Sequence, residues 1–496
     1  MKGLVALVRV MRPSEKRLLL HHYLRNTNSQ DKMRLKLFNL VRTGTNTDEE
    51  ARAKLNSGGS ASSYSHLKAR LKDDILNILL LQDTSKRFAQ ANRAAELDCR
   101  KKVAQSHLLL LRGAQVEGMK VLEAALISAD KFELLAERLQ INHLLREKFL
   151  GAGSSIELNE LNKKIQVDMK RYEALLKVQE KSFILASPEY AAKLRKRSND
   201  KQNLELIEEL RNLYKKHKLA RIGFWYYMAA TEYHSARENF AEVVELGLKF
   251  LKLVEKSPAV HSKTNMAGVN QTVGLAYLEL RDFDKSENHF EQSSKLFPQS
   301  GFNRLQSLQL LVQAEAATKN YEDAIKHIDQ ALSHPRIGGR EHLVPRWLYF
   351  KSCVEFLKGE VNESFKTLNK DSYIIRQVDE WNVQFRLLEM MQLAEFQDEE
   401  WLEFKIDSTR KFLTRHKDLA TLRVKAAVDI LSNLLRRDLD FTALSEKNME
   451  LLRACLHEYS GYEWHPTGSE VVRFDLWVVS KIPDWNRDEV GQSESE

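Results

Sequence analysis

Apolar residues recur at helical spacing along almost the whole chain. In one long segment Leu67, Leu71, Ile75 and Ile78 form a single stripe, as expected for one buried face of a helix. The same spacing predicts helices over residues 14–25, 31–42, 47–56, about 64–89, 91–149, 156–185 and 187–200. Between residues 200 and 465 no segment alternates with the period of two that a half-buried strand requires.

The amino-acid composition agrees with this pattern. The chain has 496 residues but only 19 glycines and 8 prolines, about 5% together, whereas about 12% is usual. Turns consume glycine and proline, so a chain this poor in both has few turns or long elements. Leu, Glu, Lys, Ala and Arg, which favour helix, are abundant. The sequence therefore predicts an all-α fold.

Part of the chain follows a longer repeating pattern. Residues 270–298 read Asn270-x2-Val273-Gly274-x2-Tyr277, then Phe283, Ser286-x3-Phe290, Ser293 and Pro298. This order resembles the tetratricopeptide repeat (TPR), which places W-x2-L-G-x2-Y, A-x3-F and P over 34 residues. Asn270 departs from the family, which prefers an aromatic residue there.

Weaker copies of the pattern flank this unit. In the next one the second half matches well, but Val312 stands at the glycine position and Glu315 at the tyrosine position. The equivalent positions Phe240, Phe283, Tyr321 and Val361 recur at intervals longer than the family norm. Residues ~220–370 therefore resemble degenerate TPRs. Small residues such as Gly274 would let paired helices approach, and aromatic ones such as Phe290 would fill the space between pairs.

The resemblance implies an architecture and a binding mode. We expect a right-handed superhelical array of antiparallel helix pairs, a TPR-like α-solenoid, over residues 114–480. A basic N-terminal helical bundle would occupy residues 1–113, and 486–496 would form a disordered tail. In the family, certain first-helix positions face inward. Carried over, they are Gly268, Gln271, Leu275, Leu278, Glu279, Gln306, Gln309, Gln313, Ala316 and Ala317. As partner-binding candidates we select Gln271, Glu279, Gln309, Gln313, Arg346 and Tyr349.

The charge is distributed unevenly. Residues 1–120 contain 23 Lys and Arg against 11 Asp and Glu, while the remainder is slightly acidic. Within this part, residues 47–76 have the outline of a helix-turn-helix, although the small-residue loop 57–63 is longer than usual. If the second helix entered a DNA groove, its N-terminal residues would read the bases. The nucleic-acid-binding candidates are Tyr64, His66, Lys68, Arg70 and Lys72.

The sequence contains no motif for catalysis, a cofactor or a metal. It lacks a phosphate-binding glycine loop, H-E-x-x-H and C-x-x-C. The pairs His21–His22 and Cys455–His457 point to different faces of a helix. The "RIGGR" segment (336–340) is interpreted as a loop, and the group around His457, Trp464 and His465 as a C-terminal capping loop. We therefore expect no catalytic residue, cofactor or metal, and no small-molecule substrate.

Compartment and function follow from these observations. The three cysteines, Cys99, Cys353 and Cys455, are too few and too distant for a disulfide framework, which fits a reducing compartment. No apolar run reaches the length of a membrane helix, and the N-terminus does not resemble an export signal. The sequence predicts a cytoplasmic, non-enzymatic scaffold that binds a partner peptide or helix on a concave surface. Two alternatives remain open: a transcription regulator with a DNA-binding head and a TPR-like sensor, and a regulator of a signalling enzyme.

Overall fold

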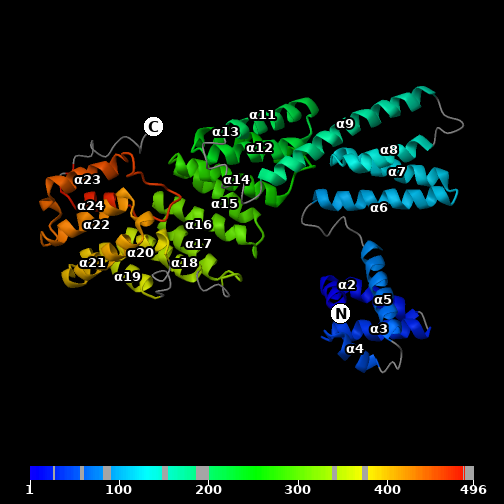
Figure 1. Cartoon of the computed structure of the whole chain (residues 1–496), viewed down its shortest axis with the longest axis horizontal. Helices are drawn as coiled ribbons and strands as arrows, with labels where there is room; N and C mark the ends of the chain where they lie inside the picture. Colours follow the sequence, from blue (N-terminus) through cyan, green and yellow to red (C-terminus); the bar gives the residue numbers. More distant parts are fainter. Residues whose placement is uncertain are drawn as a thin grey trace. The chain divides into compact units, whose positions relative to one another are not determined.

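A computed structural model describes residues 1–25, 28–55, 61–81, 91–147, 155–185, 200–337, 343–370, 378–483 and 485 (Figure 1). Within these ranges the chain is helical and contains no strand. It divides into two compact units, Met1–Asp168 and Met169–Glu496. The predicted class, an all-α array of antiparallel helix pairs with an N-terminal helical bundle, is confirmed.

The first unit begins with a small helical bundle. Leu19, Tyr23, Phe38 and Leu71 are among the buried side chains of its core. A second cluster around Cys99 and Leu122 joins the helices that follow. The helices of this unit are α1 (Lys2–Val10), α2 (Pro13–Arg25), α3 (Ser29–Arg42), α4 (Asp48–Leu55), α5 (Ala61–Leu81), α6 (Ala91–Leu111), α7 (Gln115–Lys131), α8 (Leu135–Glu147) and α9 (Ser155–Leu185), which continues into the second unit.

The second unit is a series of helices, each packed on the next in chain order (Figure 1). Its main core runs from Leu278 to Val478 and buries aromatic and aliphatic side chains from many successive helices. The helices are α11 (Asp200–His217), α12 (Ala220–Ser235), α13 (Phe240–Lys256), α14 (Lys263–Glu279), α15 (Phe283–Leu296), α16 (Phe302–Ala317), α17 (Tyr321–Leu332), α18 (Leu343–Leu357), α19 (Val361–Leu368), α20 (Glu380–Glu395), α21 (Glu399–Arg415), η3 (Lys417–Leu419), α22 (Leu422–Leu435), η4 (Phe441–Ala443), α23 (Glu446–Leu456) and α24 (Phe474–Ser480).

The same tight turn joins the two helices of successive pairs. One turn residue has a left-handed backbone, and the next helix begins two residues after it. The residue between them donates its N–H to a carbonyl in the last turn of the preceding helix, as from Asp282 to Tyr277 at 3.0 Å. The left-handed residues are Glu238, Arg281, Lys319, Gly359 and Gln397, with φ of 58°, 63°, 63°, 83° and 55°. The equivalent positions Phe240, Phe283, Tyr321 and Val361 each begin the second helix of a pair.

The residues that carry the TPR resemblance make the helix–helix contacts. Phe290 is fully buried, and a Cβ added at Gly274 would lie 2.9 Å from its ring. Only glycine therefore allows α14 to approach α15 this closely. The positions equivalent to Phe290 in the next two pairs, Ile328 and Leu368, are buried as well. The TPR-like character of this region is confirmed.

Polar contacts accommodate two departures from the family pattern. Asn270, at the usual aromatic position, is 2.8 Å from the ring nitrogen of His289, and Tyr277 stacks on the same ring. In the next pair Glu315 takes the tyrosine position and contacts His327 at 2.8 Å. In both pairs the histidine lies twelve residues after the residue at the tyrosine position. The contact between these two positions is a ring stack in the first pair, Tyr277 on His289, and an ion pair in the second, Glu315 with His327.

Some of the predicted helix bounds differ from the structure, and others lie outside the described residues. The helix expected over 64–89 is observed as α5, Ala61–Leu81. Residues 56–60, 82–90, 187–199, 338–340 and the proposed tail 486–496 lie outside the described residues. The proposed boundary at residues 113 and 114 falls in the turn between α6 and α7, inside the first unit, and it stays a prediction. In the described part of the chain, no helix is both long and apolar enough to cross a membrane.

Candidate functional site

Residues 458–473, which connect α23 to α24, run against the first helices of the repeat pairs without forming a helix themselves; we call them the strap. Gln313 of α16 donates to the carbonyl of Gly468 at 2.8 Å, and Tyr349 of α18 donates to the carbonyl of Ser469 at 2.8 Å. Glu279 of α14 accepts a hydrogen bond from the Thr467 hydroxyl. Three consecutive strap residues are therefore held by three successive first helices.

A buried arginine fixes the far end of the strap. Arg423 of α22 makes a two-pronged contact with Glu470 at 2.7 and 2.8 Å and reaches Asp475 at 2.9 Å. It also donates to the carbonyl of Tyr462 at 3.2 Å. Burial alone would lower the pKa of Arg423, but the charges of Glu470 and Asp475 outweigh it and raise the pKa. This cluster of three charged side chains is buried, so it acts as a structural clamp.

Two further arginines enclose Trp464 of the strap. The guanidinium groups of Arg281 and Arg473 lie 5.6 and 4.9 Å from the centre of its ring. Arg281 forms an ion pair with Glu458, and Arg473 pairs with Asp475 at 2.6 Å. The indole N–H donates to the carbonyl of Glu470 at 2.9 Å. Trp464 is thus held in one orientation.

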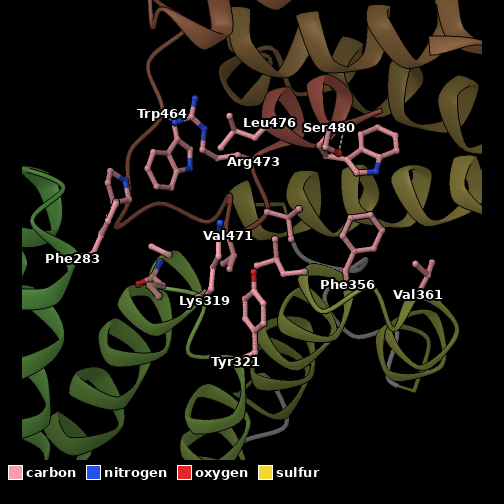
Figure 2. Close-up of a pocket in the computed structure, with 18 of the residues that line it drawn as sticks. Phe283, Lys319, Tyr321, Phe356, Val361, Trp464, Val471, Arg473, Leu476 and Ser480 are labelled. Carbon is pink, nitrogen blue, oxygen red and sulfur yellow. Dashed lines mark hydrogen bonds between the residues drawn. The ribbon is translucent and has the colours of Figure 1, made fainter. Parts of the chain in front are cut away.

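A pocket of about 600 Å3 lies between the repeat helices, the strap and α24. Figure 2 shows Tyr321 and Phe356 extending from the repeat side toward Val471 and Leu476 on the opposite wall. The turn residues Arg281, Lys319 and Gly359 belong to the same lining. The repeated turn therefore places one residue from each of three helix pairs at the pocket, together with the residue that begins each second helix: Phe283, Tyr321 and Val361.

The charges around the pocket are mostly compensated. Glu395, the single carboxylate of the lining, accepts from the Trp477 indole at 2.7 Å and from Lys481 at 2.8 Å. Arg281 and Arg473 have the partners given above. Lys319 is exposed, and no ion pair joins it to a carboxylate among the described residues. The pocket thus combines aromatic walls with one uncompensated cation.

A second hollow, of about 540 Å3, lies along the same strap. Strap residues between Gly461 and Glu470 form one side of it, and α20, η3 and the start of α22 form the other. Trp464 lines both cavities. The strap therefore has free volume beside it in two places.

The six partner-binding candidates have different surroundings. Glu279, Gln313 and Tyr349 contact the strap, as described above. Gln271 and Gln309 are half-buried. Arg346 lies 4.5 Å from the centre of the Trp381 ring, and burial lowers its pKa. Three of the six candidates thus lie on the face that the strap covers, and their role in binding a partner stays a prediction. From the sequence, the group around His457, Trp464 and His465 was interpreted only as a capping loop, which did not predict that this segment lies on the first helices of the repeat pairs.

The five nucleic-acid candidates lie in α5. Tyr64 is buried, and its hydroxyl donates to Asp48 at 3.0 Å. Lys68 pairs with the same carboxylate at 2.9 Å. The N-terminal ammonium, with Lys68 and Tyr64, lowers the pKa of Asp48 to about 2. The other three candidates, His66, Arg70 and Lys72, are exposed. Arg70 donates a hydrogen bond to the Gln30 side chain at 2.6 Å. Their role stays a prediction.

The paired and buried titratable groups can also be compared with the needs of a metal site. Among the described residues, no cluster of three or more His, Cys, Asp or Glu side chains could hold a metal ion. Cys99, Cys353 and Cys455 are buried free thiols, and burial raises the pKa of Cys99 to about 11 and that of Cys455 to about 12. His457, just before the strap, stacks on Tyr459.

Comparisons with known proteins are limited to the fold. No family model and no curated protein matches the chain. A signal transduction ATPase with a TPR sensor from Pyrococcus horikoshii is 14% identical; the match covers 86% of this chain but only 56% of that one, with a TM-score of 0.38. The Rap conjugation gene regulator of plasmid pLS20, in complex with a Phr peptide, is 14% identical over 63% of this chain and 95% of its own, with a TM-score of 0.36.

A Rap protein complexed with competence and sporulation factor is 15% identical over 70% of this chain and 98% of its own, with a TM-score of 0.39. The chain therefore spans little more than half of the first of these proteins. Identities and TM-scores of this size support no inference about ligands or partners.

Proposed function

We propose that the chain is a non-enzymatic, cytoplasmic protein-interaction scaffold that holds an extended peptide segment on the face formed by α14, α16 and α18. One observation carries this proposal: a non-helical segment of the protein's own chain, the strap, lies on that face. Gln313 and Tyr349 bind it through its main-chain carbonyls. A peptide of almost any sequence offers such carbonyls, so the same donors suit a partner segment.

The neighbouring pocket would supply selectivity. Main-chain contacts hold a peptide without reading its sequence, whereas a pocket selects the side chain that enters it. The 600 Å3 pocket opens beside the strap and is walled by aromatic side chains. Buried, unreactive thiols and the absence of a metal cluster in the described residues support a binding role over a catalytic one.

Site-specific photo-crosslinking in the native cell tests the proposal. Benzoylphenylalanine replaces Leu476, which lines the pocket, in the full chain. We expect an adduct with a discrete partner peptide, identified by mass spectrometry. The matched control places the same group at Leu248, which is exposed on α13. Equal labelling at both positions, or none at Leu476, would contradict the proposal.

DNA binding by the first unit is a second candidate, favoured by the exposed side chains of His66, Arg70 and Lys72 along α5. If Arg70 and Lys72 contact phosphates, binding of random duplex DNA should weaken steeply with salt because counterions are released. The Arg70→Glu and Lys72→Glu double variant should then lose binding, while Lys411→Glu, an exposed change in α21, should not. Salt-independent binding would exclude this candidate.

A further inference from the structure

We propose that the 600 Å3 pocket is a binding site for a ligand that joins a flat or branched apolar group to an anionic group. This inference rests on the proposed function and gives it a chemical class: an apolar side chain next to a carboxylate in a partner peptide. A free aromatic carboxylic acid offers the same chemistry. The test below separates these two sources.

The walls of the pocket specify the apolar part of the ligand. Tyr321 and Phe356 come from the repeat side, while Trp464, Leu476 and Trp477 come from the strap and α24 (Figure 2). A volume of about 600 Å3 lies within the usual range of ligand pockets, about 300–1,000 Å3. Flat groups pack well between aromatic rings, through offset or edge-to-face contacts.

The charges specify the anionic part. The pocket is lined by four cations, Arg281, Lys319, Arg473 and Lys481, against the single carboxylate of Glu395. That carboxylate already accepts from the Trp477 indole and pairs with Lys481, so its charge is compensated before a ligand enters. An anion entering the pocket would meet cations and suffer little repulsion.

Lys319 is the cation best placed to bind the anion. It occupies the left-handed position of the turn between α16 and α17, where the bond from Asn320 N–H to the Glu315 carbonyl, 2.8 Å, fixes the backbone. Its side chain is exposed, and within the described ranges no ion pair neutralises it. Binding an anion there would break no existing ion pair, unlike binding at the other three cations.

Two fluorescent probes test the two parts of the ligand separately. Anilinonaphthalene sulfonate joins a flat apolar group to an anion, and phenylnaphthylamine is its neutral analogue. Both are titrated against the full chain. We expect Lys319→Glu to weaken sulfonate binding about fivefold or more, because it reverses the nearby charge, and to leave the neutral probe unchanged. Lys411→Glu, an exposed change in α21, should alter neither affinity.

A pocket-filling variant locates the probe. Ala317, half-buried at the end of α16, lines the pocket, and Ala317→Trp should abolish binding of both probes. The control is Ala104→Trp at an exposed position of α6. Helical circular dichroism of each variant must equal that of the parent. Undiminished sulfonate binding by folded Ala317→Trp, or an equal loss in Lys411→Glu, would overturn the proposal.

Displacement of the bound sulfonate identifies the source of the ligand. The competitors are N-acetyl-Trp-Asp-amide, which represents a peptide, and indole acetate, which represents a free acid. Displacement by either supports the proposal and assigns the source, whereas displacement by neither reduces the probe to adventitious dye binding and overturns it. If the probes fail but the Leu476 crosslink still captures a peptide, this inference falls and the scaffold function stands. If the probes bind and the crosslink fails, the pocket still binds this class of ligand, and the scaffold function falls.

Discussion

The repeat pairs and the strap are held together by different kinds of contact. Between α14 and α15 Phe290 packs closely against Gly274, and polar contacts such as that of Asn270 with His289 lie beside this apolar packing. The strap is held by hydrogen bonds to Glu279, Gln313 and Tyr349 and by the ion cluster of Arg423, and only its end, at Val472, joins the buried hydrophobic core. Burial of apolar area dominates folding stability, whereas a single hydrogen bond adds little net. The array should therefore survive changes that loosen the strap.

The polar contacts that hold the strap are relevant to the proposed function. A segment held by few, distinct polar contacts can leave a surface without unfolding it, which a core residue cannot do. The two cavities along the strap indicate that its side chains do not fill the space they cross. Competition between the strap and a partner segment for the same donors is consistent with the proposed function. Four changes, in order of decreasing expected effect, test how separate the two regions are.

The change Phe290→Ala should act on the array and cost about 3–5 kcal/mol of unfolding free energy, because it leaves a cavity in a close-packed core. Chemical denaturation followed by circular dichroism measures it. Phe302→Ala is the matched control, since that ring is 43% exposed, and it should change stability by no more than about 0.5 kcal/mol. A Phe290→Ala protein as stable as the parent would refute the packing described for this pair.

The change Arg423→Met should act on the strap and cost about 3 kcal/mol, because it leaves Glu470 buried without its partner. Arg473 still neutralises Asp475, which limits the loss. Hydrogen exchange should accelerate in strap residues 461–473 and stay slow in α14 and α15.

Arg410→Met is the control, since that arginine forms only a surface pair with Asp429 at 3.6 Å. Equal acceleration in the strap and in the repeat helices would mean that the two regions unfold together.

The change Tyr349→Phe should cost about 1 kcal/mol, because it removes one hydrogen bond to the Ser469 carbonyl and keeps the ring. Faster exchange near Gly468 and Ser469 would report it. Tyr459→Phe, at a ring that is 59% exposed, should have no effect. Unchanged hydrogen exchange near Gly468 and Ser469 in the Tyr349→Phe variant would show that this bond does not hold the strap.

The smallest effect concerns pH and the array alone. The hydrogen bond to Glu315 raises the pKa of His327 above 6.5, and burial opposes it. Because the folded-state pKa is raised, this contribution to stability is complete below pH 6.5 and is lost as pH rises through the folded value. His327→Gln should flatten this part of the stability–pH curve, measured by denaturation between about pH 6 and pH 8. A curve that keeps its slope in the variant would assign the slope to other groups.

The sequence anticipated much of the fold because the relevant signals are local. The spacing of Leu67, Leu71 and Ile75 along one turn after another marks a buried helix face without knowledge of what covers it. The positions of Gly274 and Phe290 are set by contacts between neighbouring helices, so they recur in order along the chain. Glu279, Gln313 and Tyr349 could be selected because the face that the first helices present follows from that register, and all three contact the strap.

Only the tertiary structure decided what occupies that face. The bonds that hold the strap join residues separated by 120 to 188 positions, and the Arg423 cluster brings together three helices and a loop. Contacts of this kind have no period, and a polar residue reads the same in a sequence whether water or a distant carbonyl satisfies it. The sequence by itself determined the helices, their turns and the repeat register, since neighbours along the chain enforce them. The strap and its pocket exist only because the folded array brings distant polar groups within hydrogen-bonding distance.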